Sequence, residues 1–275
     1  MRIDVRKTAK LFIGGAFVRS ESGRSSRVTD GGQPTNVARA SRKDVRDAVR
    51  AARAGQSIWS AKTAYNRGQI LYRLAEMMEA RRGDFGVSPR EFSGAVDRVV
   101  WYAGWCDKFE QFLSTKNPVA GPHHCVSAPE PTGVVAVIAP ERSPLLGLVS
   151  TIVPPLAAGN AVVAVVAPAW PNALLAFAES VATCDLPAGA LNLLTGDRAE
   201  LAQILARHMD VNALSIWDRD EALLRDVTIL GAGNVKRIDA HREPSPTAWQ
   251  RAQTRSPQRI AAFVEIKTVW HPAGV

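Results

Sequence analysis

A charged pair, Glu141 and Arg142, stands in the turn of the stretch VIAPERSPLLG (137–147), between an apolar run and a helix-like segment. In α/β proteins, cofactors and substrates bind where a parallel strand ends and the next helix begins. The pair sets an acidic residue beside a basic one at such a place, and an arginine can stabilise an anion. The pair is therefore either a working site or the remains of one.

The other side chains that could do chemistry are scattered. Cys106, Cys125 and Cys184 lie far apart, and none stands beside an evident base in a strand-to-helix turn, where a catalytic thiol would be activated. His123-His124-Cys125 could hold a soft metal, but no further ligands are near in sequence, so we expect no metal site. GAGN (231–234) follows a helix rather than a strand and is predicted to be a helix C-terminus. Phosphate-loop, HExxH, CxxC and GxSxG motifs do not occur.

The composition is that of an ordinary globular protein. The chain has 275 residues, of which 46% are hydrophobic and 22% charged, which suits one large domain or two modest ones. Three sparse cysteines favour a reducing cytoplasm over a disulfide framework. We expect no signal peptide and no membrane span. The net charge is +8, but the arginines form no run with interleaved aromatics, so we expect no nucleic-acid partner.

The first third of the chain reads as a β-hairpin, a loop and three helices. Residues 10–18 form the hairpin with a Gly14-Gly15 turn, and the polar residues 19–40 form the loop. The helices are expected at 41–55, 64–82 and about 90–115, the first with Ser41 as N-cap and Asp44 three residues on. In the third, an aromatic stripe at helical spacing is predicted to face the core: Trp101, Trp105, Phe109 and Phe112.

From residue 131 onward, short apolar strands alternate with helices. Such alternation predicts an open parallel sheet of about five strands, with helices on both faces. Residues 241–260 are polar and rich in Pro, Ser and Arg, and read as a linker, and 261–275 hold a single strand that needs a partner. The strands are expected at 133–139, 161–166, 189–194, 211–217 and 235–239.

These stretches, in this order, resemble the aldehyde dehydrogenase superfamily, most of all its divergent branch with domains that lack the catalytic cysteine. The resemblance implies a doubly wound Rossmann-like sheet with an N-terminal helical layer, as one dinucleotide-binding-type domain over 1–240. It also implies a β oligomerisation arm in which a segment near 123–133 pairs with 261–270. The resemblance rests on KLFIGGAFV, EPTGVVAVIAPERSPLLG, VPPLAAGNAVV, DLPAGALNLLTGD, HMDVNAL and FVEIKTVW.

The family's functional positions are altered in this chain. Arg142 stands where the family has the asparagine that stabilises the oxyanion. Val165 begins the segment that replaces the ribose-binding Lys and Glu, and Asp218-Arg219 replaces the Gly-Ser of the pyrophosphate loop, with Asp218 expected to cap the helix. The resemblance implies NAD or NADP as cofactor, bound weakly or no longer bound. The positions left to contact it are Ile138, Ala139, Pro140, Val165 and Trp217.

The strand NVKRI (234–238) resembles the one that leads to the family's general-base glutamate, but Asp239-Ala240-His241 follows it. The segment with the nucleophilic cysteine has no counterpart in this sequence. We therefore expect a non-catalytic subunit that oligomerises with itself or with a full-length aldehyde dehydrogenase. Two alternatives stay open: an NAD(P)-dependent oxidoreductase acting on aldehydes, and a nucleotide-binding sensor.

Overall fold

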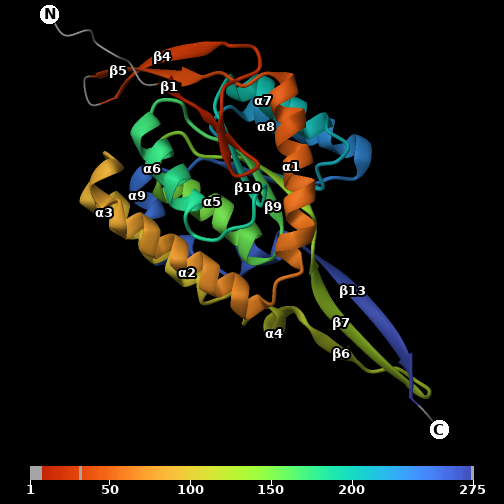
Figure 1. The fold of residues 1–275 in the computed structure, drawn as a ribbon. Coiled ribbons are helices and arrows are strands. Elements are labelled where there is room, and N and C mark those ends of the chain that lie inside the picture. The colour runs from red at the N-terminus through yellow and green to blue at the C-terminus, as the bar shows by residue number, and fades with distance from the viewer. Residues whose placement is uncertain (1–7, 31–32, 274–275) are drawn as a thin grey trace, which may run out of the picture.

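A seven-stranded mixed sheet runs through the centre of the protein (Figure 1). The structure is a computed structural model and describes residues 8–30 and 33–273. Five strands are parallel, as predicted, and the predicted N-terminal hairpin adds two antiparallel strands beside the last of them. The order across the sheet is β12 (Arg237–Arg242), β11 (Ala213–Asp218), β8 (Val134–Ile138), β9 (Ala161–Val165), β10 (Leu191–Leu194), β2 (Leu11–Ile13) and β3 (Ala16–Val18).

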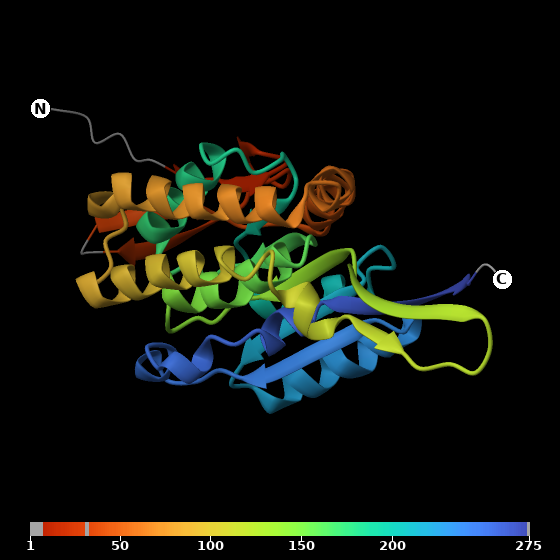
Figure 2. The ribbon, with the colours of Figure 1, turned by 90° about the horizontal axis from the view of Figure 1, so that it is seen from below.

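Helices cover both faces of this sheet, which is why its central strands are continuous apolar runs. Every residue of β8 and β9 is buried. One face packs against α1 (Arg42–Ser60), α7 (Arg198–Arg207) and α8 (Glu221–Gly231). On the other face α5 lies against the sheet, and α2 and α3 run side by side outside it (Figure 2). The helices of that face are α2 (Ala64–Ala80), α3 (Pro89–Ala103), α5 (Leu146–Ala157) and α6 (Pro171–Ala182).

The first helix begins as predicted and ends later. Ser41 accepts a hydrogen bond from the Asp44 N–H and the Asp44 carboxylate accepts one from the Ser41 N–H, which completes a capping box. The expected end at Gly55 is wrong, because α1 continues to Ser60. A Cβ on Gly55 would lie 2.5 Å from the backbone N of Ala190. The glycine therefore serves the close approach of α1 to a neighbouring loop and does not end the helix.

The third predicted helix is broken. It ends at Ala103, and a short α4 (Phe109–Leu113) follows after a turn. Because the turn interrupts the helical period, the aromatic stripe reaches the core only in part. Phe109 is buried and Trp105 is half-buried, but Phe112 is 70% exposed. The expectation that the whole stripe is core is therefore wrong at its last member.

The stretch 19–40 is not a loop, as its composition suggested. Its second half forms β4 (Ser25–Asp30) and β5 (Gln33–Ala38), which pair with each other and, through β5, with β1 (Thr8–Ala9). The prediction failed because most of β4 is exposed, so its sequence carries no apolar alternation.

The predicted linker at 241–260 is folded onto the body. β12 extends to Arg242, and Trp249 and Ile260 behind it are fully buried. Arg98, itself buried, donates hydrogen bonds to the Trp249 carbonyl at 2.8 Å and to the Thr254 hydroxyl at 2.8 Å. Polar composition misled here because a few large apolar side chains and one arginine anchor the segment. Its helices are α9 (Pro246–Trp249), the 3-10 turn Ala252–Thr254 and α10 (Gln258–Ala261).

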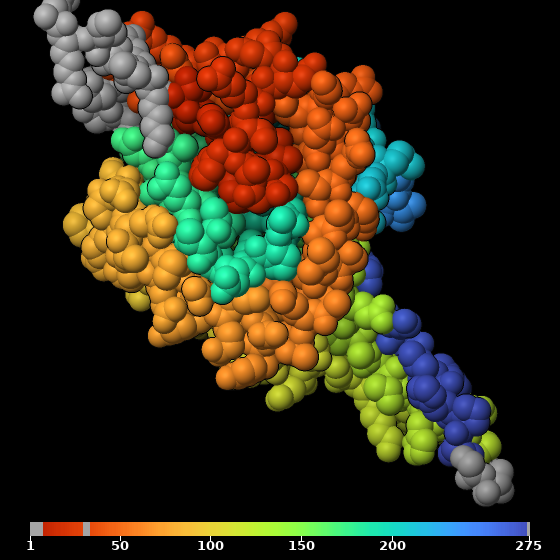
Figure 3. Space-filling model, in the orientation of Figure 1, coloured from red at the N-terminus to blue at the C-terminus, as the bar shows by residue number. Residues whose placement is uncertain are grey.

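A three-stranded arm projects from the body, and the space-filling view shows it as a narrow extension (Figure 3). The predicted pairing is confirmed, because β7 (His123–Pro131) and β13 (Val264–Pro272) run antiparallel over nine residue pairs. A short β6 (Thr115–Asn117) pairs with the other edge of β7. Within the described residues, no helix combines the length and the apolar character needed to cross a bilayer.

Candidate functional site

The sheet has a topological switch point between β8 and β11. The chain proceeds from β8 through β9 to β10 in one direction, then returns to place β11 and β12 on the other side of β8. Open α/β sheets bind ligands in the crevice at the carboxyl ends of such strands. The predicted cofactor positions are brought together at these ends, and all five are buried: Ile138, Ala139, Pro140, Val165 and Trp217.

An arginine that the sequence analysis did not single out lies across this crevice. Arg198 is the first residue of α7, and its guanidinium donates to the carbonyls of Ala139 and Trp217. It also forms an ion pair with the Asp218 carboxylate, and the two side chains are only 13% and 14% exposed. Arg198 therefore ties the end of β8 to the end of β11. The available signal was its place directly after a helix N-cap, Asp197, at the end of a βα turn.

The start of α8 is already filled by carboxylates of the chain itself. The Asp218 carboxylate accepts from the N–H groups of Arg219 at 2.7 Å and Asp220 at 2.9 Å. The N-cap is Asp220 and not Asp218 as expected, and it accepts from the N–H of Ala222 at 2.9 Å. Burial alone would raise the pKa of Asp218, but these N–H groups and Arg198 hold that pKa below its ordinary value.

These contacts decide whether a dinucleotide could be bound at the crevice in the way that the resemblance implies. A pyrophosphate needs free N–H groups at a helix N-terminus and a backbone that it can approach closely. Just before α8 the N–H groups of Arg219 and Asp220 donate to Asp218, and in its first turn the N–H of Ala222 donates to Asp220. The charges of both carboxylates repel phosphate. The residues present do not fit the group at this place.

The turn at Glu141 and Arg142 is held by its backbone, while both side chains are exposed. The Arg142 N–H donates to a carboxylate oxygen of Glu243 at 2.8 Å, and Glu243 is 8% exposed. On the other side, the Glu91 carboxylate accepts from the N–H groups of Leu145 and Leu146 at 3.2 and 3.0 Å. The assignment of Arg142 to the family's oxyanion position stays a prediction.

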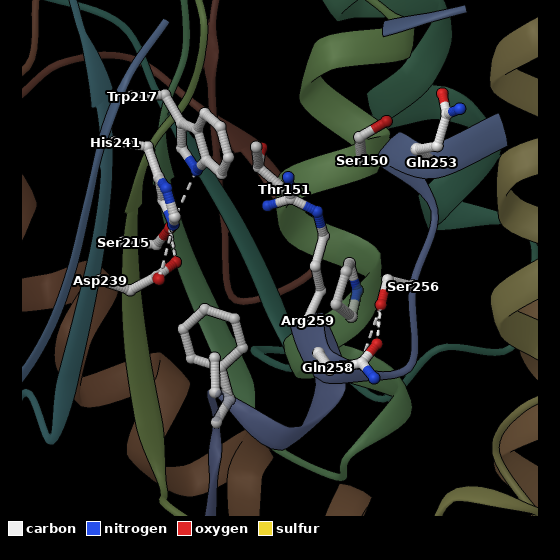
Figure 4. A pocket seen from close by; sticks show the side chains of 13 residues that line it. Ser150, Thr151, Ser215, Trp217, Asp239, His241, Gln253, Ser256, Gln258 and Arg259 are labelled. Atoms are coloured by element: carbon white, nitrogen blue, oxygen red, sulfur yellow. Dashed lines mark hydrogen bonds and ion pairs between the residues drawn. The ribbon is translucent and has the colours of Figure 1, made fainter. Parts of the chain in front are cut away.

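A cavity of about 280 Å³ lies between α5, the last strands of the sheet and residues 253–263 (Figure 4). Ser215 and Trp217 of β11 stand opposite Asp239 and His241 of β12, and alternation along the strands puts all four on one face. The Trp217 indole donates to the Ser215 hydroxyl at 3.0 Å, and that hydroxyl donates to Asp239 at 3.0 Å. The other Asp239 oxygen lies 2.6 Å from His241 Nε2.

The network can hold a proton but contains no activated nucleophile. Burial raises the pKa of Asp239, yet the hydrogen bonds from His241 and Ser215 bring that pKa below its ordinary value. An imidazole oriented by a carboxylate is suited to general-base work. However, the Ser215 hydroxyl donates to Asp239 and not to His241. His241 also stacks on Trp217 with ring centres 4.1 Å apart, which fixes its ring in the cavity wall.

None of the three cysteines is placed for catalysis. Burial raises the pKa of Cys106 to about 12 and that of Cys184 to about 11, so both stay thiols at neutral pH. Cys125 is buried in the arm, where the Asn117 side-chain amide donates to its sulfur at 3.4 Å. In the part of the chain that the structure describes, no cluster of three His, Cys, Asp or Glu side chains could hold a metal ion.

Comparisons with known proteins agree with this architecture. The model of the aldehyde dehydrogenase family matches residues 19–222. Human cytosolic 10-formyltetrahydrofolate dehydrogenase is 32% identical over 85% of this chain, which covers 28% of that protein. The mitochondrial benzaldehyde dehydrogenase of Antirrhinum majus is 32% identical over 83% of this chain, which covers 46% of its length.

Solved structures give the same result. An aldehyde dehydrogenase from Burkholderia cenocepacia, described as putative, matches with a TM-score of 0.78 and 29% identity over 85% of this chain. PnpE from Pseudomonas sp. WBC-3 matches with a TM-score of 0.79 and 27% identity over 86% of this chain. The chain spans about half of each of those structures. With its fold, its family match and these relatives in agreement, the chain belongs to the aldehyde dehydrogenase family.

Proposed function

We propose that this chain is a non-catalytic aldehyde dehydrogenase-like subunit that assembles through its β arm, with a second copy of itself or with a full-length aldehyde dehydrogenase. The observation that carries the proposal is the free edge of β13. That strand is nine residues long and pairs only with β7 on its inner side among the described strands. A long unpaired edge is a template for another strand.

The arm also exposes apolar side chains that a partner would cover. Ile266 is 52% exposed and Trp270 is 57% exposed, and both lie on the same face of β13, with Thr268 between them. Val126 and Val269 stand opposite each other on the other face, 40% and 37% exposed. Large apolar side chains that gather on a projecting arm are typical of an interface.

The crevice residues and the cysteines also support a non-catalytic role. The crevice that would take a dinucleotide is bridged by Arg198, and the N–H groups at and just before the start of α8 donate to carboxylates of the chain. Both features weigh against an oxidoreductase and against a nucleotide-binding sensor. The buried, unreactive cysteines weigh against a covalent aldehyde intermediate within these residues. Because all three cysteines are free thiols, we place the subunit in the cytoplasm.

Size-exclusion chromatography with light scattering tests the proposal on the chain alone and mixed with a full-length aldehyde dehydrogenase from the same source. We expect a dimer or larger species, or a mixed complex. A protein that runs only as a monomer in both samples would refute assembly. Aldehyde-dependent NADH formation by the pure chain, lost when a cysteine is changed to alanine, would refute the non-catalytic role. Calorimetric heat with NAD at micromolar ligand would favour the sensor.

A further inference from the structure

A basic groove lies away from the crevice, the cavity and the arm, between α1 and α7. It has a volume of about 620 Å³. Of the six described residues that line it, five are cationic or can become so, and the sixth is Ile204. The two helices run alongside each other, and α1 contributes its first turns while α7 contributes its last turn. The basic residues are Arg42, Lys43, Arg46, Arg207 and His208.

The cations of the groove exceed the carboxylates that face them. Lys43 lies 3.3 Å from Glu21 and Arg46 lies 3.0 Å from Asp47, so two of the four permanent charges have a partner. These pairs are exposed and weak in water. Among the described residues, no carboxylate lies within ion-pair distance of Arg42 or Arg207, the remaining two permanent charges. Counted over the described residues, two permanent cations of the groove therefore have no carboxylate partner.

His208 adds a group whose charge depends on what occupies the groove. Its Nδ1 accepts from the Asp210 N–H at 3.2 Å, so Nε2 is the nitrogen left to carry a proton. Burial and the charge of Lys236 lower the pKa of His208, against the opposing effect of Asp210. An anion bound beside this ring would favour the imidazolium and raise its pKa.

We infer that the groove binds a small molecule carrying several phosphate groups. An arginine guanidinium can donate two parallel hydrogen bonds to a phosphate group. The three arginines of the groove come from two helices. The volume is that of a small-ligand site. No aromatic side chain is among its described lining residues, so nucleic-acid bases would find no stacking platform. The positive charge of the groove therefore favours phosphate groups, and the volume of the groove limits the ligand to a compact molecule.

Calorimetric titration with inorganic tripolyphosphate tests the inference directly. The variant Arg42→Gln/Arg46→Gln/Arg207→Gln removes three cations from the groove. Its matched control removes three exposed arginines elsewhere, Arg90→Gln/Arg225→Gln/Arg251→Gln, and so has the same net charge. We expect saturable one-to-one binding that weakens about tenfold or more in the groove variant and about twofold or less in the control. In NMR titrations, saturating tripolyphosphate should raise the pKa of His208.

Three results would overturn the inference. The first is no saturable binding by the unchanged protein, and the second is equal weakening in both variants, which would show a general attraction to positive surface. The third is tight binding of a single-stranded RNA oligonucleotide that displaces tripolyphosphate and is lost in the groove variant, which would make the groove a nucleic-acid site. Thermal unfolding of both variants, with midpoints near that of the unchanged protein, would show that a loss of binding is not a loss of fold.

Discussion

Removing the guanidinium of Arg198 should destabilise the fold more than removing any single exposed charge. Arg198→Met leaves the Asp218 carboxylate buried without its partner, together with the carbonyls of Ala139 and Trp217. Both members of the ion pair are less than one-sixth exposed, so solvent screens it little. Breaking a buried pair by removing one partner costs about 3–5 kcal/mol of unfolding free energy.

Urea denaturation at pH 7 measures this loss, and a double-mutant cycle isolates the pair. Asp218→Asn should also destabilise, but the double variant should lose less than the sum of the singles, by about 1–3 kcal/mol. The matched control is Arg39→Met. That arginine lies 3.7 Å from Asp197 and 3.6 Å from Glu200, with all three side chains at least 40% exposed, and its removal should cost less than about 1 kcal/mol.

The contribution of the pair should also depend on pH. Because the pKa of Asp218 is lowered in the folded protein, its stabilising effect is full above the unfolded value and is lost as pH falls through the folded value. The stability difference between the unchanged protein and Asp218→Asn should therefore shrink below about pH 4. A cost for Arg198→Met below about 1 kcal/mol, or strict additivity in the cycle, would refute the reasoning.

Three further predictions concern the arm, the first helix and the cysteines. Ile266→Ser/Trp270→Ser should weaken self-association: each half-exposed side chain gains about 1 kcal/mol on burial, so a two-fold symmetric interface loses about 4 kcal/mol, or roughly a thousandfold in the dimer constant. Gly55→Ala should destabilise by about 1–3 kcal/mol in urea, because its methyl group would meet backbone atoms at 2.5 Å. Cys106 and Cys184, with pKa values raised to about 12 and 11, should resist iodoacetamide at pH 8 until the protein is unfolded.

The glycine prediction has a matched control within the chain, and each of the three has an outcome that would contradict it. Gly83→Ala places a methyl group where nothing lies within 4 Å, and should leave stability nearly unchanged. If both glycine variants were equally stable, the close approach at Gly55 would not matter. The arm variant should keep its circular dichroism spectrum, and an unchanged elution volume would contradict the role of β13. Rapid labelling of the native protein at Cys106 or Cys184 would contradict their burial.

The sheet was predictable because its signal is local and strong. Apolar runs such as 134–138 and 161–165 can be buried only between two layers of helices, and the helical segment between them brings the chain back for parallel pairing. The capping box at Ser41 and Asp44 was likewise readable from residue types alone. Pairing of the terminal strand came from the resemblance and not from its own sequence, since a lone alternating strand does not name its partner.

What escaped prediction depends on contacts between residues far apart in the chain. Arg198 donates to carbonyls at the ends of two separate strands, β8 and β11, and its place after the N-cap Asp197 does not by itself show which groups it contacts. Glu243 supports the turn at Arg142 from a position 101 residues away. The stretch 241–260 looked like a linker because its anchors, Trp249 and Ile260, are few and separated by polar residues. Composition averages over such anchors, whereas folding depends on each of them.

The bridge made by Arg198 also bears on our proposal that this chain does not use a dinucleotide. An empty crevice at the switch point would leave carbonyl groups and helix N–H groups without partners, each of them costly. Arg198 and Asp218 supply those partners internally. A phosphate that took the place of Asp218 would have to break the Arg198–Asp218 pair, and a coupling of about 1–3 kcal/mol would lower its affinity by roughly 5- to 150-fold. Arg198 and Asp218 therefore stabilise the carboxyl ends of β8 and β11 and also block the crevice between them. A variant that removes them to admit a dinucleotide should be measurably less stable.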